Sequence, residues 1–285
     1  MEEDRLVEER KKAIFQTLKK NKTLSGFLSI AVIALILLVA SYVKLIYFPS
    51  IHLILLIVLA LIASGLVFYG KEKYSYYVLL AWPLWIASYI RTRNLSGLKD
   101  ITTGQWTLGP DLDPFLFLRW AKYIIAHGSI MTNDIMRYVP LGYDTRGELL
   151  LTPYLIAWFY KIAGAFGFVE SITHAAVIYP VVMFFLTLIA FFFMARKILW
   201  GELGARYANI GALISLLIVS VLPSLLPRTI AGIPEKESGA FLFMFLAFYF
   251  FVSAWKTPKK HLGYVLAILS GIATAAMALT WGGFT

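Results

Sequence analysis

The sequence predicts an all-α membrane protein, a polytopic bundle of transmembrane helices. Of its 285 residues, 60% are hydrophobic and only 15% carry an Asp, Glu, Lys or Arg side chain. A soluble domain contains about a quarter charged residues. Long apolar runs recur along the chain, and short basic clusters separate them, which is the pattern that orients helices in a membrane.

Composition also excludes several classes of protein. The net charge of +10 does not indicate a nucleic-acid-binding protein, because the basic residues lie in short clusters between apolar runs. The chain contains no cysteine, which excludes disulfides, thiol nucleophiles and zinc–thiolate sites. Its four histidines are scattered without ligand spacing, so we expect no histidine-based metal centre.

The chain divides into three regions. Residues 1–26 are dense in Glu, Lys and Arg and lack the cleavage site of a secretory signal, which predicts a cytosolic N-terminal segment. We interpret residues 27–74 as an extra N-terminal transmembrane hairpin. Residues 75–285 form the main transmembrane region, and its large outer loop covers residues 91–173. The first part of that loop is polar and rich in glycine and proline, which indicates an ordered extracytoplasmic subdomain.

Charge placement fixes the expected topology. We predict seven spans, at 27–48, 51–69, 75–90, 174–195, 208–226, 238–255 and 263–280. Basic clusters at 196–206 and 256–261 anchor the adjoining helix ends in the cytosol, so segment 227–239 faces outward. The count is consistent only if the apolar stretch 149–167 does not cross. Lys161 lies in the middle of that stretch, and we therefore expect an interfacial or re-entrant helix there.

Segment 227–239 is a charged segment between two apolar runs, reading Pro-Arg-Thr-Ile-Ala-Gly-Ile-Pro-Glu-Lys-Glu-Ser-Gly. Pro234 suits the first position of a helix, which would place Glu235 and Glu237 in its first turn. Two carboxylates at one helix end, with Arg228 upstream, suit a hard divalent cation. Taken alone, these residues are better explained as a helix cap and an anchor at the membrane surface.

A second acidic cluster lies in the outer loop. Pro114 disfavours the helical conformation at Asp113, so we predict that Asp113 is the N-cap of a helix that runs through Trp120. Asp111 and Asp113 also fit a turn closed by backbone hydrogen bonds. Together with Glu235 and Glu237, however, Asp113 completes three carboxylates at helix starts on one membrane face. Such a set suits Mg²⁺ or Mn²⁺ bound together with substrate phosphate oxygens.

Four stretches carry a resemblance to a known family. Residues 111–119 read Asp-Leu-Asp-Pro-Phe-Leu-Phe-Leu-Arg, and residues 228–237 read Arg-Thr-Ile-Ala-Gly-Ile-Pro-Glu-Lys-Glu. Residues 138–143 contain Pro-Leu-Gly between two tyrosines, and residues 279–284 contain Trp-Gly-Gly. In this order they resemble the motifs of the oligosaccharyltransferase catalytic subunit, archaeal AglB type, a GT-C glycosyltransferase. The resemblance covers the chain from about residue 75 to the end.

The resemblance implies a metal-dependent glycosyltransferase that acts in protein N-glycosylation. The glycan would pass from a lipid-linked oligosaccharide, on a dolichol-type phosphate or pyrophosphate, to Asn of an Asn-x-Ser/Thr acceptor polypeptide. Asp113 would hold Mn²⁺ or Mg²⁺ and orient the acceptor amide, while Glu235 and Glu237 complete the metal site. Arg228 would orient or neutralise the acidic motif. The active face would be extracytoplasmic in the cell membrane.

Further residues are candidates for substrate binding. They are Arg119, Asp111, Tyr143 and Trp281, with Arg91 and Arg93 added as phosphate ligands by charge alone. Loop carboxylates Asp134, Asp144 and Glu148 are interpreted as solvated.

Two departures from the family pattern bear on function. Both acidic positions of the second motif are Glu, and Lys236 lies between them, which would weaken metal affinity. The family also continues into more spans and a soluble domain with a Trp-Trp-Asp motif, so we expect this N-terminal portion to be inactive alone. The alternatives are another GT-C enzyme, of the O-mannosyl or aminoarabinose type, and a non-enzymatic lipid or solute transporter.

Overall fold

The computed structural model describes residues 50–284. The chain divides into two compact units, one ending at Pro83 and the other beginning at Leu84. The predicted cytosolic segment 1–26 and the predicted span at 27–48 lie outside the described residues.

The first unit contains α2 (Ser50–Phe68) and the first half of α3 (Glu72–Thr92). Gly70 makes the turn between these helices with a φ of 72°, a value that glycine adopts without strain. The indole Nε1 of Trp82 donates a hydrogen bond to the carbonyl oxygen of Leu56 at 3.0 Å. This bond ties the two helices together within the unit.

Five helical segments of the described part are long and apolar enough to cross a membrane: Ile51–Phe68, Ile172–Gly201, Gly204–Val221, Lys236–Lys256 and Lys260–Thr280. They coincide with five of the seven predicted spans. The predicted span at 75–90 falls in α3 but is not among them. Tyrosines and tryptophans take the place of aliphatic residues along α3, which lowers its mean hydropathy.

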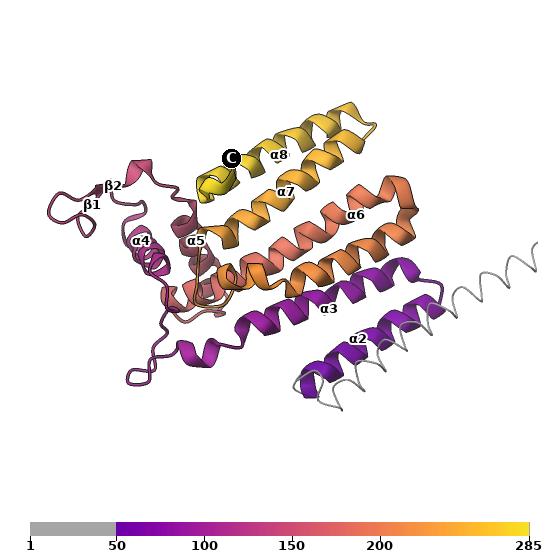
Figure 1. Ribbon diagram of the computed structural model, residues 1–285, viewed down its shortest axis with the longest axis horizontal. Coiled ribbons are helices and arrows are strands. Elements are labelled where there is room, and N and C mark those ends of the chain that lie inside the picture. Colours follow the sequence, from indigo (N-terminus) through magenta and orange to yellow (C-terminus); the bar gives the residue numbers. More distant parts are fainter. Residues whose placement is uncertain (1–49, 285) are drawn as a thin grey trace, which may run out of the picture. The chain divides into compact units, whose positions relative to one another are not determined.

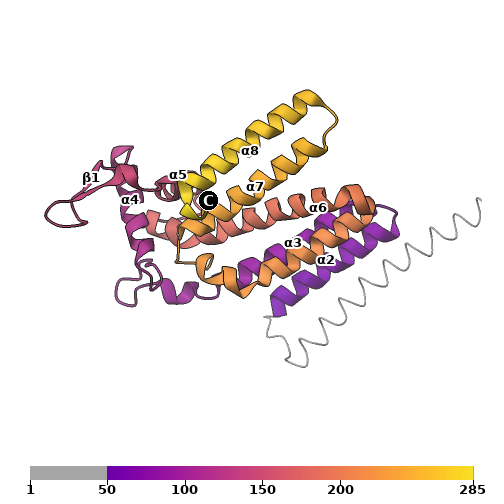
Figure 2. The same cartoon turned by 45° about the horizontal axis from the view of Figure 1, so that its top comes forward.

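The membrane helices of the second unit are α6 (Ile172–Val221), α7 (Lys236–Lys256) and α8 (Lys260–Thr280). The 50-residue α6 is two helices in sequence, because Gly204 has a φ of 74° and a ψ of 169°. Figure 1 shows α6 running out and back on itself. Helix α7 packs between α6 and α8, an arrangement that is also visible in Figure 2.

Shorter elements form the polar end of the second unit: η1 (Leu95–Leu98), α4 (Asp113–His127), β1 (Asn133–Asp134), β2 (Tyr143–Asp144), η2 (Thr145–Gly147), α5 (Leu151–Ala165), η3 (Pro223–Arg228) and η4 (Gly282–Phe284). Strands β1 and β2 pair antiparallel, with Asn133 opposite Asp144. Helix α5 has 15 residues, or about 22 Å, which is shorter than the hydrocarbon core of a bilayer. The stretch 149–167 therefore does not form a span, as the topology required.

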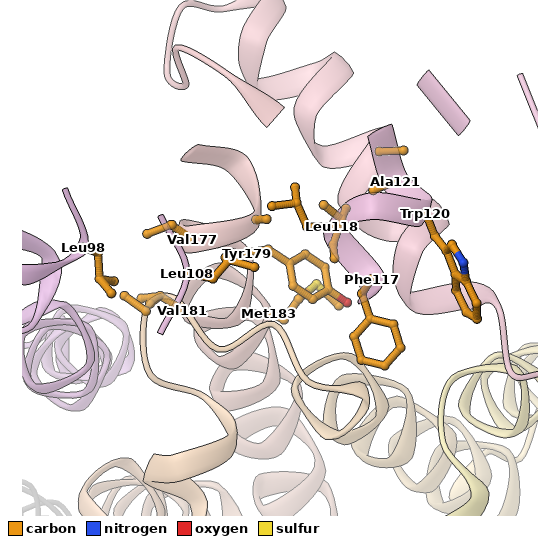
Figure 3. Close-up of a cluster of buried hydrophobic side chains, with 14 of the residues drawn as sticks. Leu98, Leu108, Phe117, Leu118, Trp120, Ala121, Val177, Tyr179, Val181 and Met183 are labelled. Atoms are coloured by element: carbon orange, nitrogen blue, oxygen red, sulfur yellow. The ribbon is translucent and has the colours of Figure 1, made fainter. Parts of the chain in front are cut away.

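A buried apolar cluster joins these outer elements to the first turns of α6. Phe117 and Trp120 of α4 pack with Val177 and Tyr179 of α6 (Figure 3). Trp120 is fully buried, and so is Ile156 of α5. Burial of two aromatic side chains and their aliphatic neighbours stabilises this junction by several kcal/mol. The start of α4 is thereby held against the end of the bundle.

Candidate functional site

The segment between η3 and α7 is hydrogen-bonded into the polar end of the bundle. The amide of Ala231 donates to the carbonyl oxygen of Arg91 at 2.9 Å. The amide of Gly232 donates to the carbonyl oxygen of Val177 at 2.9 Å, and Gly109 donates to the carbonyl oxygen of Gly232 at 2.8 Å. These bonds bring the residues before α4 and the residues before α7 side by side.

Gly232 is required at the centre of this junction. Its φ of 85° lies in the left-handed region, and a Cβ at this position would lie 2.6 Å from Cδ1 of Leu98. The neighbouring Ala231 is fully buried. The small Ala231–Gly232 pair thus allows neighbouring backbone segments to approach closely, and it positions the charged residues on either side of it.

Arg91 lies beneath this junction and is fully buried. Its Nε donates to Oγ1 of Thr229 at 2.8 Å, and its Nη1 donates to the carbonyl oxygen of Ser220 at 2.9 Å. The guanidinium also stacks over the ring of Phe184, with 3.6 Å from Cζ to the centroid. Arg91 is a structural residue, and the expectation that it binds a lipid phosphate is wrong.

Acidic residues lie close to Arg228 at the start of α7. Nη1 of Arg228 lies 3.3 Å from Oε1 of Glu235 and 4.0 Å from Oδ2 of Asp111. Its Nε lies 3.8 Å from Oε1 of Glu237. Asp113 is near enough to raise the pKa of Glu235 electrostatically. We call Asp111, Asp113, Glu235 and Glu237 the acidic cluster.

Glu235 is the most perturbed member of the acidic cluster. Its side chain is only 5% exposed, whereas that of Arg228 is 47% exposed. Burial and repulsion from Glu237 raise the pKa of Glu235 to about 7, and Arg228 opposes this rise. Three carboxylates lie within 4.0 Å of one guanidinium, and Asp113 adds a fourth acidic group nearby, so the site has an excess of acidic groups that a cation would neutralise.

Helix α4 begins one residue earlier than the sequence predicted, and α7 begins two residues later. Helix α4 begins at Asp113 with Leu112 as its N-cap, so Asp113 lies in the first turn and is not the cap. Asp111 accepts a hydrogen bond from the Leu112 amide at 2.7 Å, which supports that earlier start. Helix α7 begins at Lys236, and Glu235 takes the N-cap position with a ψ of 161°. Pro234 therefore precedes the helix, and this turns Glu235 toward Arg228.

Lys236 does not neutralise the acidic cluster. Its Nζ lies 3.5 Å from Oε2 of Glu148 and 5.6 Å from the centroid of the Phe117 ring. Glu148 also accepts from the Tyr143 hydroxyl at 2.8 Å and from Arg137 at 3.3 Å. The positive charge of Lys236 is thus compensated outside the cluster. Tyr143 is linked to the start of α7 through Glu148.

Arg119 is engaged by Asp134, whose side chain is only 1% exposed. Asp134 accepts from Nη1 of Arg119 at 2.8 Å, from Nε1 of Trp120 at 2.9 Å and from the amide of Met136 at 3.1 Å. These bonds hold the pKa of Asp134 at about 2. The expectation of a solvated carboxylate is wrong for Asp134 and for Glu148, and it holds for the exposed Asp144.

Trp281 lies beside the first turns of α7. Its ring packs edge-on against that of Phe241, one turn beyond Glu237, with 6.2 Å between centroids. A Cβ at Gly283 would lie 2.3 Å from Cη2 of this ring, so glycine is needed where the chain passes it.

Sequence reasoning did not single out Thr229, Arg137 or Glu148 as supports of the site. Only the charge of Lys236, which required a partner, hinted at Glu148.

The donor chemistry of the acidic cluster fits a hard divalent cation. Carboxylate oxygens are the preferred ligands of Mg²⁺ and Mn²⁺, and the buried Glu235 lacks full compensation by Arg228. Within residues 50–284 no three acidic or histidine side chains converge into a ready-made metal site. Arg228 lies among the carboxylates, and a bound cation would have to take over its role as counter-ion.

Comparison with known proteins covers most of the second unit. Residues 102–285 match the family described as oligosaccharyl transferase STT3, N-terminal. A curated relative is the dolichyl-phosphooligosaccharide-protein glycotransferase of Methanococcus voltae, 21% identical over 183 residues. The match covers 60% of this chain and 19% of that protein. The chain therefore spans about a fifth of the length of the curated relative.

Two solved structures of the Archaeoglobus fulgidus oligosaccharyltransferase share the fold. One is a complex with Zn and sulfate, with a TM-score of 0.58 at 19% identity, covering 72% of this chain and 25% of that one. The other is tethered through a disulfide to an acceptor peptide with the NVT sequon, with a TM-score of 0.58 at 18% identity, covering 75% and 25%. They confirm an all-α polytopic bundle. Since the family match covers more than half of its residues, this multi-pass membrane chain belongs to the oligosaccharyl transferase STT3 family.

Proposed function

We propose that this chain forms the metal-binding half of an oligosaccharyltransferase active site in protein N-glycosylation. The observation that carries the proposal is the acidic cluster. Asp113 begins α4 and Glu235 caps α7, and the chain folds them to one end of the bundle around Arg228. Ionisable groups held at a membrane boundary are costly, and they mark functional sites more often than structural ones.

In this proposal a lipid-linked oligosaccharide, on a dolichol-type phosphate or pyrophosphate, donates its glycan to Asn of an Asn-x-Ser/Thr sequon. A bound Mg²⁺ or Mn²⁺ would supply a Lewis acid for the negative charge of the departing phosphate. Asp113, Glu235 and Glu237 would hold it. The M. voltae relative is named for a dolichyl-phosphooligosaccharide, and one A. fulgidus structure carries an acceptor peptide with the NVT sequon. Both support this choice of substrates.

Asp113 has a second role at the acceptor amide. An amide nitrogen is a poor nucleophile, because its lone pair is delocalised into the carbonyl group. A carboxylate that accepts hydrogen bonds from the amide N–H groups orients the nitrogen toward the sugar carbon, and positioning of this kind lowers the barrier substantially. Asp113 is suited to this role because, among the described ion pairs, none joins it to Arg228.

Arg228 serves as the counter-ion of the acidic cluster. It is half exposed and lies within 4.0 Å of three carboxylates, so it offsets their mutual repulsion while the site is being assembled. The remaining half-exposed guanidinium face is positioned to meet a donor phosphate. Tyr143 and Trp281 flank the start of α7 and are candidates for contacts with the substrates. Arg119 is paired with Asp134, so it would contribute to the site by holding the surrounding loop rigid.

We further propose that the acidic cluster faces the outside of the cell membrane and that the N-terminus is cytosolic. The basic residues at the bend in the middle of α6 and in the last turn of α7 support this orientation.

The test uses the complete protein that contains this chain, reconstituted with a lipid-linked glycan. Asp113→Asn and Glu235→Gln should each lower transfer to an Asn-x-Thr peptide by about 100-fold or more, because each removes stabilisation of the transition state. Asp100→Asn, which removes an exposed carboxylate of the same outer region, is the control and should leave transfer unchanged. EDTA should abolish transfer, and the order in which Mg²⁺ and Mn²⁺ restore it identifies the metal.

Acceptor choice separates the proposal from its nearest rival. Asn-x-Thr peptides, Ser/Thr peptides without the sequon and lipid A are offered side by side. Transfer to hydroxyl groups only would assign the chain to another GT-C activity. If the protein moved lipid across the membrane and transferred no glycan to any acceptor, the chain would be assigned to a transporter.

A further inference from the structure

A second site lies at the end of the bundle opposite the acidic cluster. Helix α7 has 21 residues, so Glu237 in its first turn and Lys256 in its last are separated by about 30 Å. Figure 1 shows this far end, where α7 turns into α8 beside the bend of α6. An open cavity of about 800 Å³ is located there, lined by Phe193, Arg196, Lys197, Trp200, Gly201, Tyr249, Trp255 and Lys256.

The cavity combines cations with aromatic rings. Nζ of Lys256 donates to the carbonyl oxygens of Lys197 at 3.1 Å and Ile198 at 2.7 Å, so it fixes the end of α7 against the first half of α6. The guanidinium of Arg196 stacks over Trp200, with 4.3 Å from Cζ to the centroid. Its Nε is bonded to the side-chain oxygen of Asn209, which sets the plane of the group.

The charges of this cavity are not balanced by the described residues. Among the lining side chains that the structure describes, none is a carboxylate. None of the ion pairs among the described side chains involves Arg196, Lys197 or Lys256. An anion that entered the cavity would meet up to three positive groups, with a planar guanidinium already oriented.

An apolar groove leads from this cavity toward the middle of the helices. It has a volume of about 430 Å³ and is lined by Leu186, Ile189, Ala190, Phe193, Leu242, Leu246 and Tyr249. Phe193 and Tyr249 line both spaces, and their rings lie 6.3 Å apart. From Lys197 back to Leu186 the helix rises about 17 Å, which is roughly half of a hydrocarbon core.

We propose that the cavity and the groove together bind a membrane lipid with an anionic phosphate headgroup. The headgroup occupies the basic cavity at the membrane surface, and one hydrocarbon chain lies along the groove between α6 and α7. A charged mouth with a continuous apolar groove matches an amphiphile, and basic pockets between membrane helices suit phosphate headgroups. The inference is independent of the glycosyltransferase proposal, because this site lies at the other end of the bundle.

The test compares two charge-matched double variants of the complete protein. Arg196→Gln with Lys197→Gln removes two charges from the cavity. Lys259→Gln with Lys260→Gln removes two exposed charges from the same end without touching the cavity. Each protein is placed in nanodiscs of phosphatidylcholine with increasing phosphatidylglycerol, and the lipid that it retains after extraction is counted by native mass spectrometry. The cavity variant should bind phosphatidylglycerol about tenfold more weakly than the control variant.

Further arms separate headgroup, chain and rival occupants. Arg196→Lys, which keeps the charge, should restore most of the retention. Leu246→Trp, which fills the groove, should lower retention while the surface charge is unchanged. Inorganic phosphate alone should not raise the melting temperature. The proposal would be overturned if both double variants retained equal amounts of lipid, or if phosphatidylcholine were retained as well as phosphatidylglycerol. It would also be overturned if inorganic phosphate raised the melting temperature. The absence of any retained lipid, as when another helix of the complete protein fills the groove, would overturn it too.

Discussion

At the scale of single residues, the site is built from charges that folding would not select by itself. Glu235 is buried and its pKa is raised to about 7 from an ordinary value of 4.5, so its charged form is less stable in the folded chain than in the unfolded one. The resulting contribution to stability is fully present below pH 4.5 and is lost as the pH rises through about 7. This cost at neutral pH supports the proposed role of Glu235 in binding a cation.

Replacement of this carboxyl group should therefore stabilise the protein. In EDTA at pH 8, Glu235→Gln should melt at a higher temperature than the unmodified chain. The gain in free energy of unfolding should be on the order of 1–3 kcal/mol. The difference should shrink as the pH is lowered to 5, where Glu235 is itself neutral. Circular dichroism melts in detergent measure this. Equal melting temperatures at pH 8 would show that Arg228 compensates the charge fully, which the 3.3 Å contact alone does not predict.

Asp134 shows the opposite behaviour. Its pKa is held at about 2 against an ordinary value of 3.8, so its contribution is present above pH 3.8 and is lost as the pH falls through about 2. Asp134→Asn removes the partner of Arg119 and should cost about 2–3 kcal/mol of folding free energy. Thermal unfolding at pH 7 checks this. Asp144→Asn, which breaks an exposed ion pair with Arg146, is the control and should change little.

At the scale of elements, apolar runs and charge clusters were sufficient to predict most of the membrane helices. Gly204, which divides α6, was not singled out because its role depends on a φ of 74° that no pattern displays. The starts of α4 and α7 were misplaced by one and two residues, since Asp111 supports an earlier start and Glu235 is drawn toward Arg228. Long-range hydrogen bonds decided these details, and they are not encoded in local sequence.

The junction at Gly232 offers a test at this scale. Gly232→Ala forces a side chain into a left-handed conformation and against Leu98, so it should cost about 1–3 kcal/mol. It should also lower glycan transfer strongly, because it displaces Arg228 and Glu235 together. Gly97→Ala is the matched control, since a Cβ there would meet nothing within 4 Å. Equal activity of the two variants would show that the junction does not position the site.

At the scale of the whole molecule, the second unit is polarised. The acidic cluster lies at one end of α7, and the basic cavity lies at the other. The sequence predicted this polarity from the loop charges and the parity of the spans. It could not predict the cavity, because Arg196 and Lys256 are 60 residues apart in numbering and meet only through helix packing. The assignment of residues 27–74 to a separate hairpin stays a prediction.

Cysteine accessibility tests the orientation directly, because the chain contains no cysteine of its own. Ile101→Cys, at a fully exposed position of the polar end, should react with a membrane-impermeant maleimide on intact cells. Lys259→Cys, between α7 and α8, should react only after the cells are permeabilised. The reverse pattern of labelling would place the acidic cluster in the cytosol.

The backbone bonds at the Ala231–Gly232 junction also set an order of events during synthesis. The amides of these two residues donate hydrogen bonds to the carbonyl oxygens of Arg91 and Val177, which are synthesised 140 and 55 residues earlier. These two hydrogen bonds can form only after both halves of α6 have been synthesised. We therefore expect the site to assemble only after the second half of α6 and the start of α7 have been made.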